Sequence, residues 1–82
     1  MIQVIDTLLH NNRGRYLTDI ERSVLELCLQ GQTYPEISVR VERSQEQVKR
    51  IGARLWRQLS EILGETVQKK NIKGALQRYM NS

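Results

Sequence analysis

Basic side chains recur at helical spacing within residues 45–63 and supply the clearest chemistry of this chain. At about 100° per residue they gather on one side of a helix, away from an apolar side. A row of cations along a helix binds phosphate groups, and an α-helix fits the major groove of DNA. The pattern therefore favours binding of a nucleic acid. Its basic residues are Lys49, Arg50, Arg54 and Arg57.

The first half of the same segment holds side chains that read base edges. Gln pairs with adenine, Arg or Lys with guanine, and Ala contacts the thymine methyl group. Residues of these types, together with one acidic residue, are Gln45, Glu46, Lys49, Arg50 and Ala53. A charged helix face more often contacts only solvent and binds nothing. Whether this pattern indicates DNA binding therefore depends on the neighbouring elements.

No combination of residues predicts catalysis or a metal site. Cys28 and His10 are the only cysteine and histidine, so the chain has no Cys/His cluster. Cys28 stands at helical spacing from Leu25 and Leu29, which predicts a core position. No nucleophile or carboxylate cluster accompanies His10. We expect no enzymatic activity, no metal and no cofactor.

Two capped helices with a short turn between them are predicted to position the basic segment. Thr33 and Glu36 form the pattern of a capping box, and Ser44 with Gln47 repeats it. A helix, a tight turn and a longer helix are the sequence form of a helix-turn-helix. The two helices are expected at about 34–41 and 45–63.

Further helices are expected to support this unit. Thr18 with Glu21 predicts the start of a buried platform helix that ends at Gly31. The expected fold is all-α, a tetrahelical helix-turn-helix bundle with an N-terminal accessory helix. The single domain 1–82 divides into an accessory segment 1–14 (helix 2–10, turn 11–14), a core 17–63 and a closing helix 69–80.

The closing helix has two interpretations. Its apolar stripe either covers the core as a lid, with Trp56 packed against it, or contacts a second copy of the chain. Both stay open at this stage, as do two roles of Tyr34, which either packs or contacts phosphate through its hydroxyl. The residues predicted for a dimer contact are Ile72, Leu76 and Tyr79.

The composition agrees with a small folded domain. The chain is 39% hydrophobic and 27% charged, too apolar for a disordered tail. Its net charge of +4 gives a mild preference for an anionic partner. No apolar run approaches the roughly 20 residues that span a bilayer, and no signal peptide begins the chain. We expect a cytoplasmic protein.

Residues 17–60 resemble the LuxR-type (GerE-like) helix-turn-helix, which is similar to region 4 of sigma factors. The resemblance is carried by Leu17, Thr18, Glu21, Val24, Leu25, Gly31, Glu36, Ile37, Val41, Ser44, Val48, Lys49, Ile51, Leu55 and Leu59. It implies four helices, of which the third reads the major groove and the fourth mediates dimers. It also implies phosphate contacts from Thr33, Arg43 and Lys49, and base contacts from Gln45, Glu46, Arg50 and Ala53. The chain departs from the usual residues of that family at Ser38, Gln47, Ile51 and Gln58.

A narrower resemblance extends nearly from end to end. The runs GQTYPEI, RLWRQLSEILGE and KKNIKGALQRY look like the N-terminal domain of bacterial, chiefly cyanobacterial, signalling ATPases. These are proteins of the NB-ARC/NACHT kind and of the vWA-MoxR-associated systems. The resemblance implies a helix-turn-helix whose partner is either DNA or protein.

The favoured function is DNA binding in transcriptional regulation, with helix 45–63 in the major groove of double-stranded DNA. Lys49, Arg50, Arg54 and Arg57 would supply the electrostatic attachment. The alternative is a protein-interaction or self-association module of a signalling ATPase that keeps the fold without binding DNA.

Overall fold

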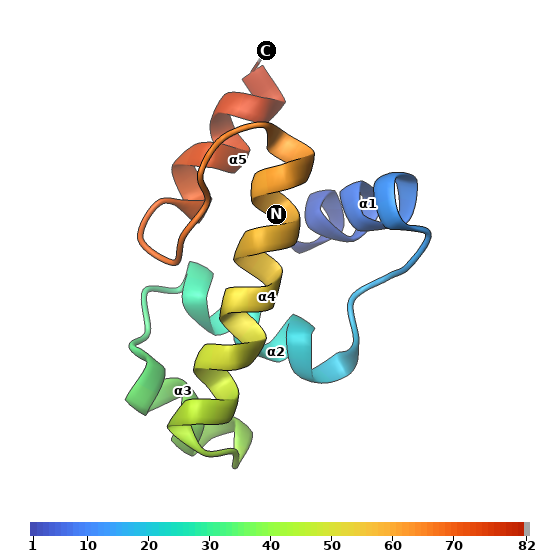
Figure 1. Ribbon diagram of the computed structural model, residues 1–82. Coiled ribbons are helices and arrows are strands. Elements are labelled where there is room, and N and C mark those ends of the chain that lie inside the picture. The colour runs from blue at the N-terminus through green and yellow to red at the C-terminus, as the bar shows by residue number, and fades with distance from the viewer. Residues whose placement is uncertain (82) are drawn as a thin grey trace.

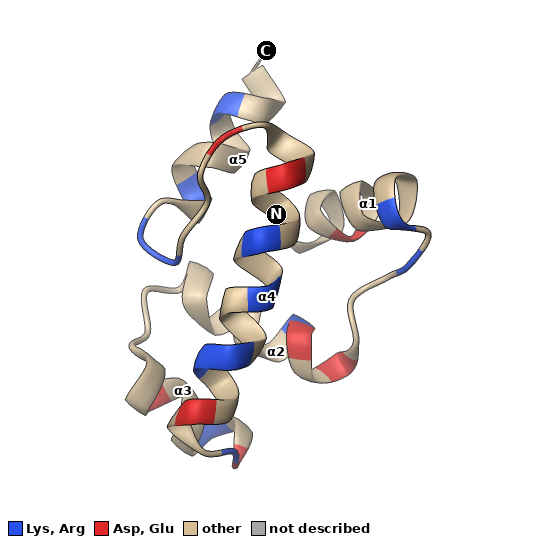
Figure 2. Cartoon of the chain, in the orientation of Figure 1, with Lys and Arg blue, Asp and Glu red and all other residues tan. Residues whose placement is uncertain are grey.

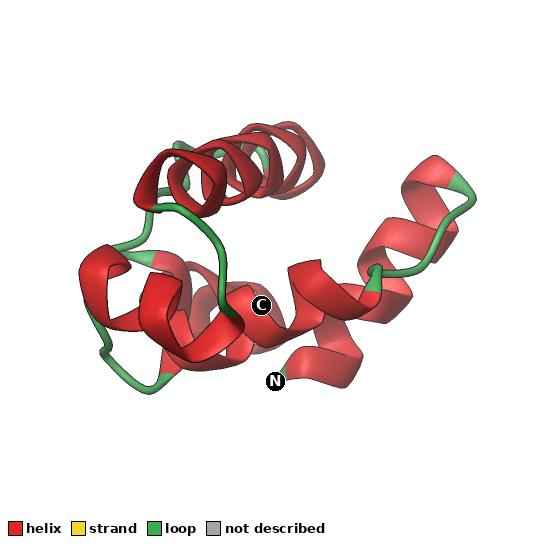
Figure 3. Cartoon of the chain, turned by 90° about the horizontal axis from the view of Figure 1, so that it is seen from below, coloured by secondary structure: helices red, strands yellow, loops and turns green. Residues whose placement is uncertain are grey.

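The structure, a computed structural model, describes residues 1–81, which form five helices joined by loops (Figure 1). The helices are α1 Ile2–Arg13, α2 Asp19–Leu29, α3 Tyr34–Val41, α4 Gln45–Leu63 and α5 Ile72–Asn81. Over this range no strand occurs, as the colouring of Figure 3 shows. The predicted all-α fold is confirmed.

Three helices begin with the capping boxes that the sequence predicts. At the start of α2, the Glu21 N–H donates to the Thr18 hydroxyl at 3.2 Å, and the Thr18 N–H donates to the Glu21 carboxylate at 2.9 Å. The other reciprocal pairs are Thr33 with Glu36 at α3 and Ser44 with Gln47 at α4. Each pair satisfies two backbone N–H groups that a bare helix end would leave open. The starts of α2, α3 and α4 are therefore fixed locally.

A left-handed residue makes the turn between α3 and α4. Glu42 has φ 57° and ψ 44°, and among residues 1–81 no other residue besides glycine has a positive φ. The Arg43 N–H then donates to the Ser38 carbonyl at 3.1 Å, which closes the end of α3. Ser38 is buried, as the close approach of the two helices predicts. The sequence indicates the turn but not its left-handed residue.

The helix α4 is the centre of the fold and contacts each of the other four helices. Figure 1 shows it in yellow to orange, crossing most of the length of the molecule. Its inner side is apolar, and Leu55 and Leu59 are fully buried. Because the apolar residues of α4 repeat every three or four positions, its opposite side is left to solvent. The buried residues of α4 are Val48, Gly52, Leu55, Trp56 and Leu59.

The accessory helix is longer than predicted. The helix α1 continues to Arg13 and ends on Gly14, whose φ is 68°. The Asn12 side chain, expected in a turn, donates to the Leu8 carbonyl at 2.9 Å within the helix. Of the predicted turn 11–14, only the glycine leaves the helix.

The last helix starts later than predicted, at Ile72 rather than near residue 69. The Asn71 side chain accepts the Gln68 N–H at 2.7 Å and donates to the Thr66 carbonyl at 2.8 Å. Asparagine side chains offer the backbone such alternatives to helical hydrogen bonds. The preceding residues therefore stay in a turn.

The helix α5 covers the core of its own chain, in agreement with the lid interpretation. Ile72, Ala75 and Leu76 are at most 2% exposed. Ile72 and Leu76 are buried within their own chain, and the predicted dimer contact stays a prediction. Tyr79 is 48% exposed and is the member of the predicted contact that reaches the surface.

Trp56 makes a contact with α3 that the sequence did not predict. Its indole N–H donates to the Tyr34 hydroxyl of α3 at 3.0 Å, and it is 8% exposed. Tyr34 is half-buried, and burial raises the pKa of its hydroxyl. Beneath the pair lies Gly52, where an added Cβ would sit 2.9 Å from the Tyr34 oxygen. Tyr34 is thus a packing residue, and it sets the distance between α3 and α4.

Candidate nucleic-acid interface

The outer side of α4 carries the predicted basic surface. In Figure 2 blue bands follow one another along the exposed side of α4, with red bands nearer its two ends. The α4 residues that the sequence assigns to this surface are all exposed: Gln45, Glu46, Lys49, Arg50, Ala53, Arg54 and Arg57. The side chains that were predicted to act together therefore share one accessible face.

The cations of α4 differ from four of the six arginines elsewhere in the described chain, because they have no carboxylate partner. Over residues 1–81, the side chains of Lys49, Arg50, Arg54 and Arg57 make no ion pair or hydrogen bond. Four other arginines are neutralised within the chain: Arg13 by Glu61, Arg15 by Glu21, Arg22 by Asp6 and Arg78 by Glu65. Charge on α4 is thus available to an outside anion.

The basic face is shallow and open. Arg50, Ala53, Arg54 and Arg57 line a surface hollow of about 190 Å³. Small-molecule and catalytic sites are usually deep and mostly apolar, with a few convergent polar groups. A broad cationic surface around a small residue suits an extended polyanion better than a small substrate.

The two phosphate contacts predicted outside α4, Arg43 and Thr33, differ in how freely they could bind a phosphate. Arg43 is exposed in the turn before α4. The Thr33 hydroxyl is also exposed, but it donates to the Glu36 carboxylate at 3.0 Å. Hydrogen bonds from Thr33 hold the pKa of Glu36 below its ordinary value, so this helix start already carries an anion. A phosphate would have to displace Glu36 to bind Thr33.

A network behind α4, which the sequence did not reveal, holds the helix in place. Arg15 donates to both Glu21 oxygens, at 2.9 and 3.1 Å, and to the Gln58 side chain of α4 at 2.7 Å. Burial raises the pKa of Glu21, and hydrogen bonds from Arg15 and Thr18 outweigh it, so the pKa lies below its ordinary value. Gln58, where the chain departs from the usual residue of the LuxR-type domains, is the α4 member of this network.

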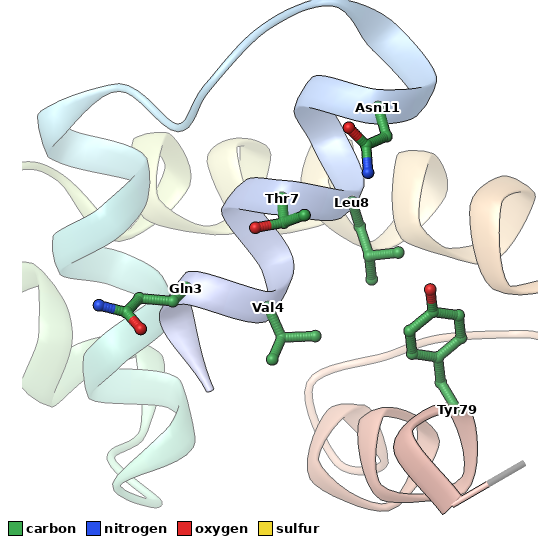
Figure 4. Close-up of a pocket in the computed structure, with 6 residues that line it drawn as sticks. All are labelled: Gln3, Val4, Thr7, Leu8, Asn11 and Tyr79. Carbon is green, nitrogen blue, oxygen red and sulfur yellow. The ribbon is translucent and has the colours of Figure 1, made fainter.

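A second surface lies between α1 and α5 and is uncharged. A hollow of about 250 Å³ is lined by Gln3, Val4, Thr7, Leu8, Asn11 and Tyr79. Figure 4 shows Val4 and Leu8 pointing from α1 toward the Tyr79 ring on α5. None of the lining side chains carries a charge, in contrast to the face of α4. This groove and the basic face thus differ in the kind of partner that they suit.

Three other features bear on metal binding, thiol chemistry and membrane insertion. No group of three or more His, Cys, Asp or Glu side chains could hold a metal ion in this range. Cys28 is buried, and burial raises the pKa of its thiol, which disfavours the reactive thiolate. None of the helices is both long and apolar enough to cross a membrane. The cytoplasmic location stays a prediction.

The comparisons with known proteins give one match. A family model described as the vWA-MoxR associated protein N-terminal HTH matches residues 1–79. This match confirms the vWA-MoxR component of the resemblance, while the LuxR-type and NB-ARC/NACHT components stay predictions. No curated protein and no solved structure matches the chain.

Proposed function

We propose that this chain, which belongs to the family of N-terminal helix-turn-helix domains of vWA-MoxR associated proteins, binds double-stranded DNA through α4. Such binding would serve transcriptional regulation. The observation that carries the proposal is the row of exposed, unpaired cations on α4 beside the base-reading types at its start. Elsewhere in the described chain, ion pairs neutralise Arg13, Arg15, Arg22 and Arg78.

The dimensions of α4 agree with this docking. Its 19 residues extend over about 28 Å, longer than the major groove is wide. The first turns, from Gln45 to Ala53, would lie against the base edges. Arg54 and Arg57 would then stand near the groove wall, where they meet phosphates. Phosphate contacts fix the register of the helix, and base contacts supply sequence preference.

A charge-reversal pair of variants tests this proposal. Arg50→Glu removes a cation from the centre of the face and adds an anion, so affinity for duplex DNA at about 50 mM salt should fall at least about tenfold. Lys73→Glu makes the same change of charge on an exposed residue of α5 and should lose much less. Fluorescence anisotropy with a labelled duplex pool measures both. Equal losses in the two variants would contradict docking through α4.

A second candidate function is supported by the uncharged groove between α1 and α5. A chain with net charge +4 repels its own copies, so self-association favours a face without charge. The groove meets this condition, and the exposed Tyr79 lines it with apolar surface. Under this function, light scattering would show an assembly that Tyr79→Glu dissolves and Arg50→Glu leaves intact.

A further inference from the structure

One carboxylate lies within the basic face of α4 and is not neutralised there. Glu46 is exposed in the first turn of α4, and its side chain makes no ion pair or hydrogen bond within the described chain. Other carboxylates are held by arginines or by a capping box: Asp6, Glu21, Glu36, Glu61 and Glu65. An acidic residue in the first turn stabilises a helix by its interaction with the helix dipole. This stabilisation does not require the side chain to lie among the cations.

Helix geometry sets Glu46 in the same row as Arg50 and Arg57. The three residues are spaced by four and seven positions, so their side chains lie one above another on the exposed side. Gln47, the next residue, is occupied, because its side-chain oxygen accepts the Ser44 N–H at 3.1 Å. Glu46 and Arg50 are therefore the free charged side chains at the start of this row.

A carboxylate that approaches DNA has one favourable base. Guanine and thymine present acceptors in the major groove, and adenine presents the N7 acceptor beside its N6 donor. Cytosine presents the N4 donor without a neighbouring acceptor. Guanine, thymine and every phosphate would repel the Glu46 carboxylate, and adenine would set its N7 acceptor beside a bond to N6.

We propose that Glu46 selects cytosine in the target and that Arg50, one turn further along α4, selects guanine. Four residues advance the helix by about 6 Å, and base pairs repeat every 3.4 Å or so. The two selected bases should therefore lie one or two base-pair steps apart. The exposed methyl group of Ala53 leaves room for the helix to approach. This inference rests on the proposed DNA binding.

Selection of binding sites from a random duplex pool tests the inference. The wild-type chain should prefer cytosine at one position by about 5- to 150-fold, with a guanine one or two steps away. Glu46→Gln should lose this preference and gain adenine there, because Gln pairs with adenine N6 and N7. Glu26→Gln, which removes an exposed and unpaired carboxylate from α2, should keep the wild-type site.

The possible failures are distinguishable. If Glu46→Gln strengthens binding to all duplexes equally and selects the wild-type site, Glu46 only repels DNA and the inference is overturned, while DNA binding stands. If the wild-type chain binds no duplex at about 50 mM salt, the proposed function fails and the inference fails with it. Thermal unfolding of each variant checks that the fold is intact.

Discussion

Gly52→Ala should destabilise the domain even though alanine is the better helix former. Gly52 lies in the interior of α4, where glycine costs about 1 kcal/mol relative to alanine. A Cβ atom here would lie 2.9 Å from the Tyr34 oxygen and 3.3 Å from the Trp56 indole nitrogen. Ordinary contact begins at 3.4 Å, so the Tyr34 hydroxyl must move by about 0.5 Å.

That movement disturbs a partly buried hydrogen bond. The Trp56 N–H donates to the Tyr34 hydroxyl at 3.0 Å, and without this acceptor it is left in a poorly solvated site. An unsatisfied buried donor costs about 1–3 kcal/mol, and overpacking costs a similar amount. The two costs overlap, because the shift that weakens the bond relieves the overpacking. After the gain in helix propensity, the expected net loss is about 1–2 kcal/mol.

Urea unfolding followed by tryptophan fluorescence measures this loss, since Trp56 is the only tryptophan. A loss of about 1–2 kcal/mol corresponds to a melting temperature lower by about 4–16 °C. The control is Gly74→Ala in α5, where the added Cβ meets only the guanidinium of Arg78, at 3.3 Å. Because that group can move away, the control should gain up to about 1 kcal/mol.

A second variant separates the clash from other causes. Tyr34→Phe removes the oxygen that the new Cβ would meet, so Gly52→Ala should cost much less in the Tyr34→Phe background than in the wild type. The reasoning is refuted if Gly52→Ala stabilises the wild-type protein as much as Gly74→Ala does, because the contact with Tyr34 would then carry no cost.

Three further predictions concern stability. Glu42→Gly should raise the free energy of unfolding by roughly 0.5–1 kcal/mol, because glycine adopts the left-handed turn without the Cβ penalty; an unchanged urea midpoint would contradict this. Hydrogen bonds from the Leu17 N–H and from Arg22 hold the pKa of Asp6 below its ordinary value. Asp6 should therefore contribute its full share to the free energy of unfolding above about pH 4, and this share should be lost as the pH falls toward the lower pKa of the folded state. Asp6→Asn should flatten this acid dependence in pH-resolved melting curves. Ser44→Ala should cost about 1 kcal/mol by removing the cap of α4, as measured by urea unfolding.

Sequence reasoning found the features that depend on neighbouring residues. The capping boxes join residues three positions apart, such as Ser44 and Gln47, so their pattern is visible in the sequence. The exposed row on α4 likewise follows from helical spacing alone. For this reason the predicted start of α4 and its basic face agree with the structure.

Features that depend on distant residues could not be found in this way. The ion pair of Arg13 with Glu61 joins residues 48 positions apart, and no local pattern shows that this arginine is neutralised while Arg50 is not. The apolar stripe of α5 has the same sequence form whether it meets its own core or a second copy. Only packing decides that Leu76 is buried and Tyr79 is exposed.

The salt dependence of DNA binding tests the central claim most directly. If Lys49, Arg54 and Arg57 each neutralise a phosphate while Arg50 contacts a base, log K should fall with log salt at a slope of about −2.7. The affinity of the wild-type chain for a duplex pool should then drop about 40-fold between roughly 50 and 200 mM salt. Arg57→Gln should make the slope shallower by about 0.9. Absence of binding at the lower salt, or binding that does not change with salt, would contradict the account.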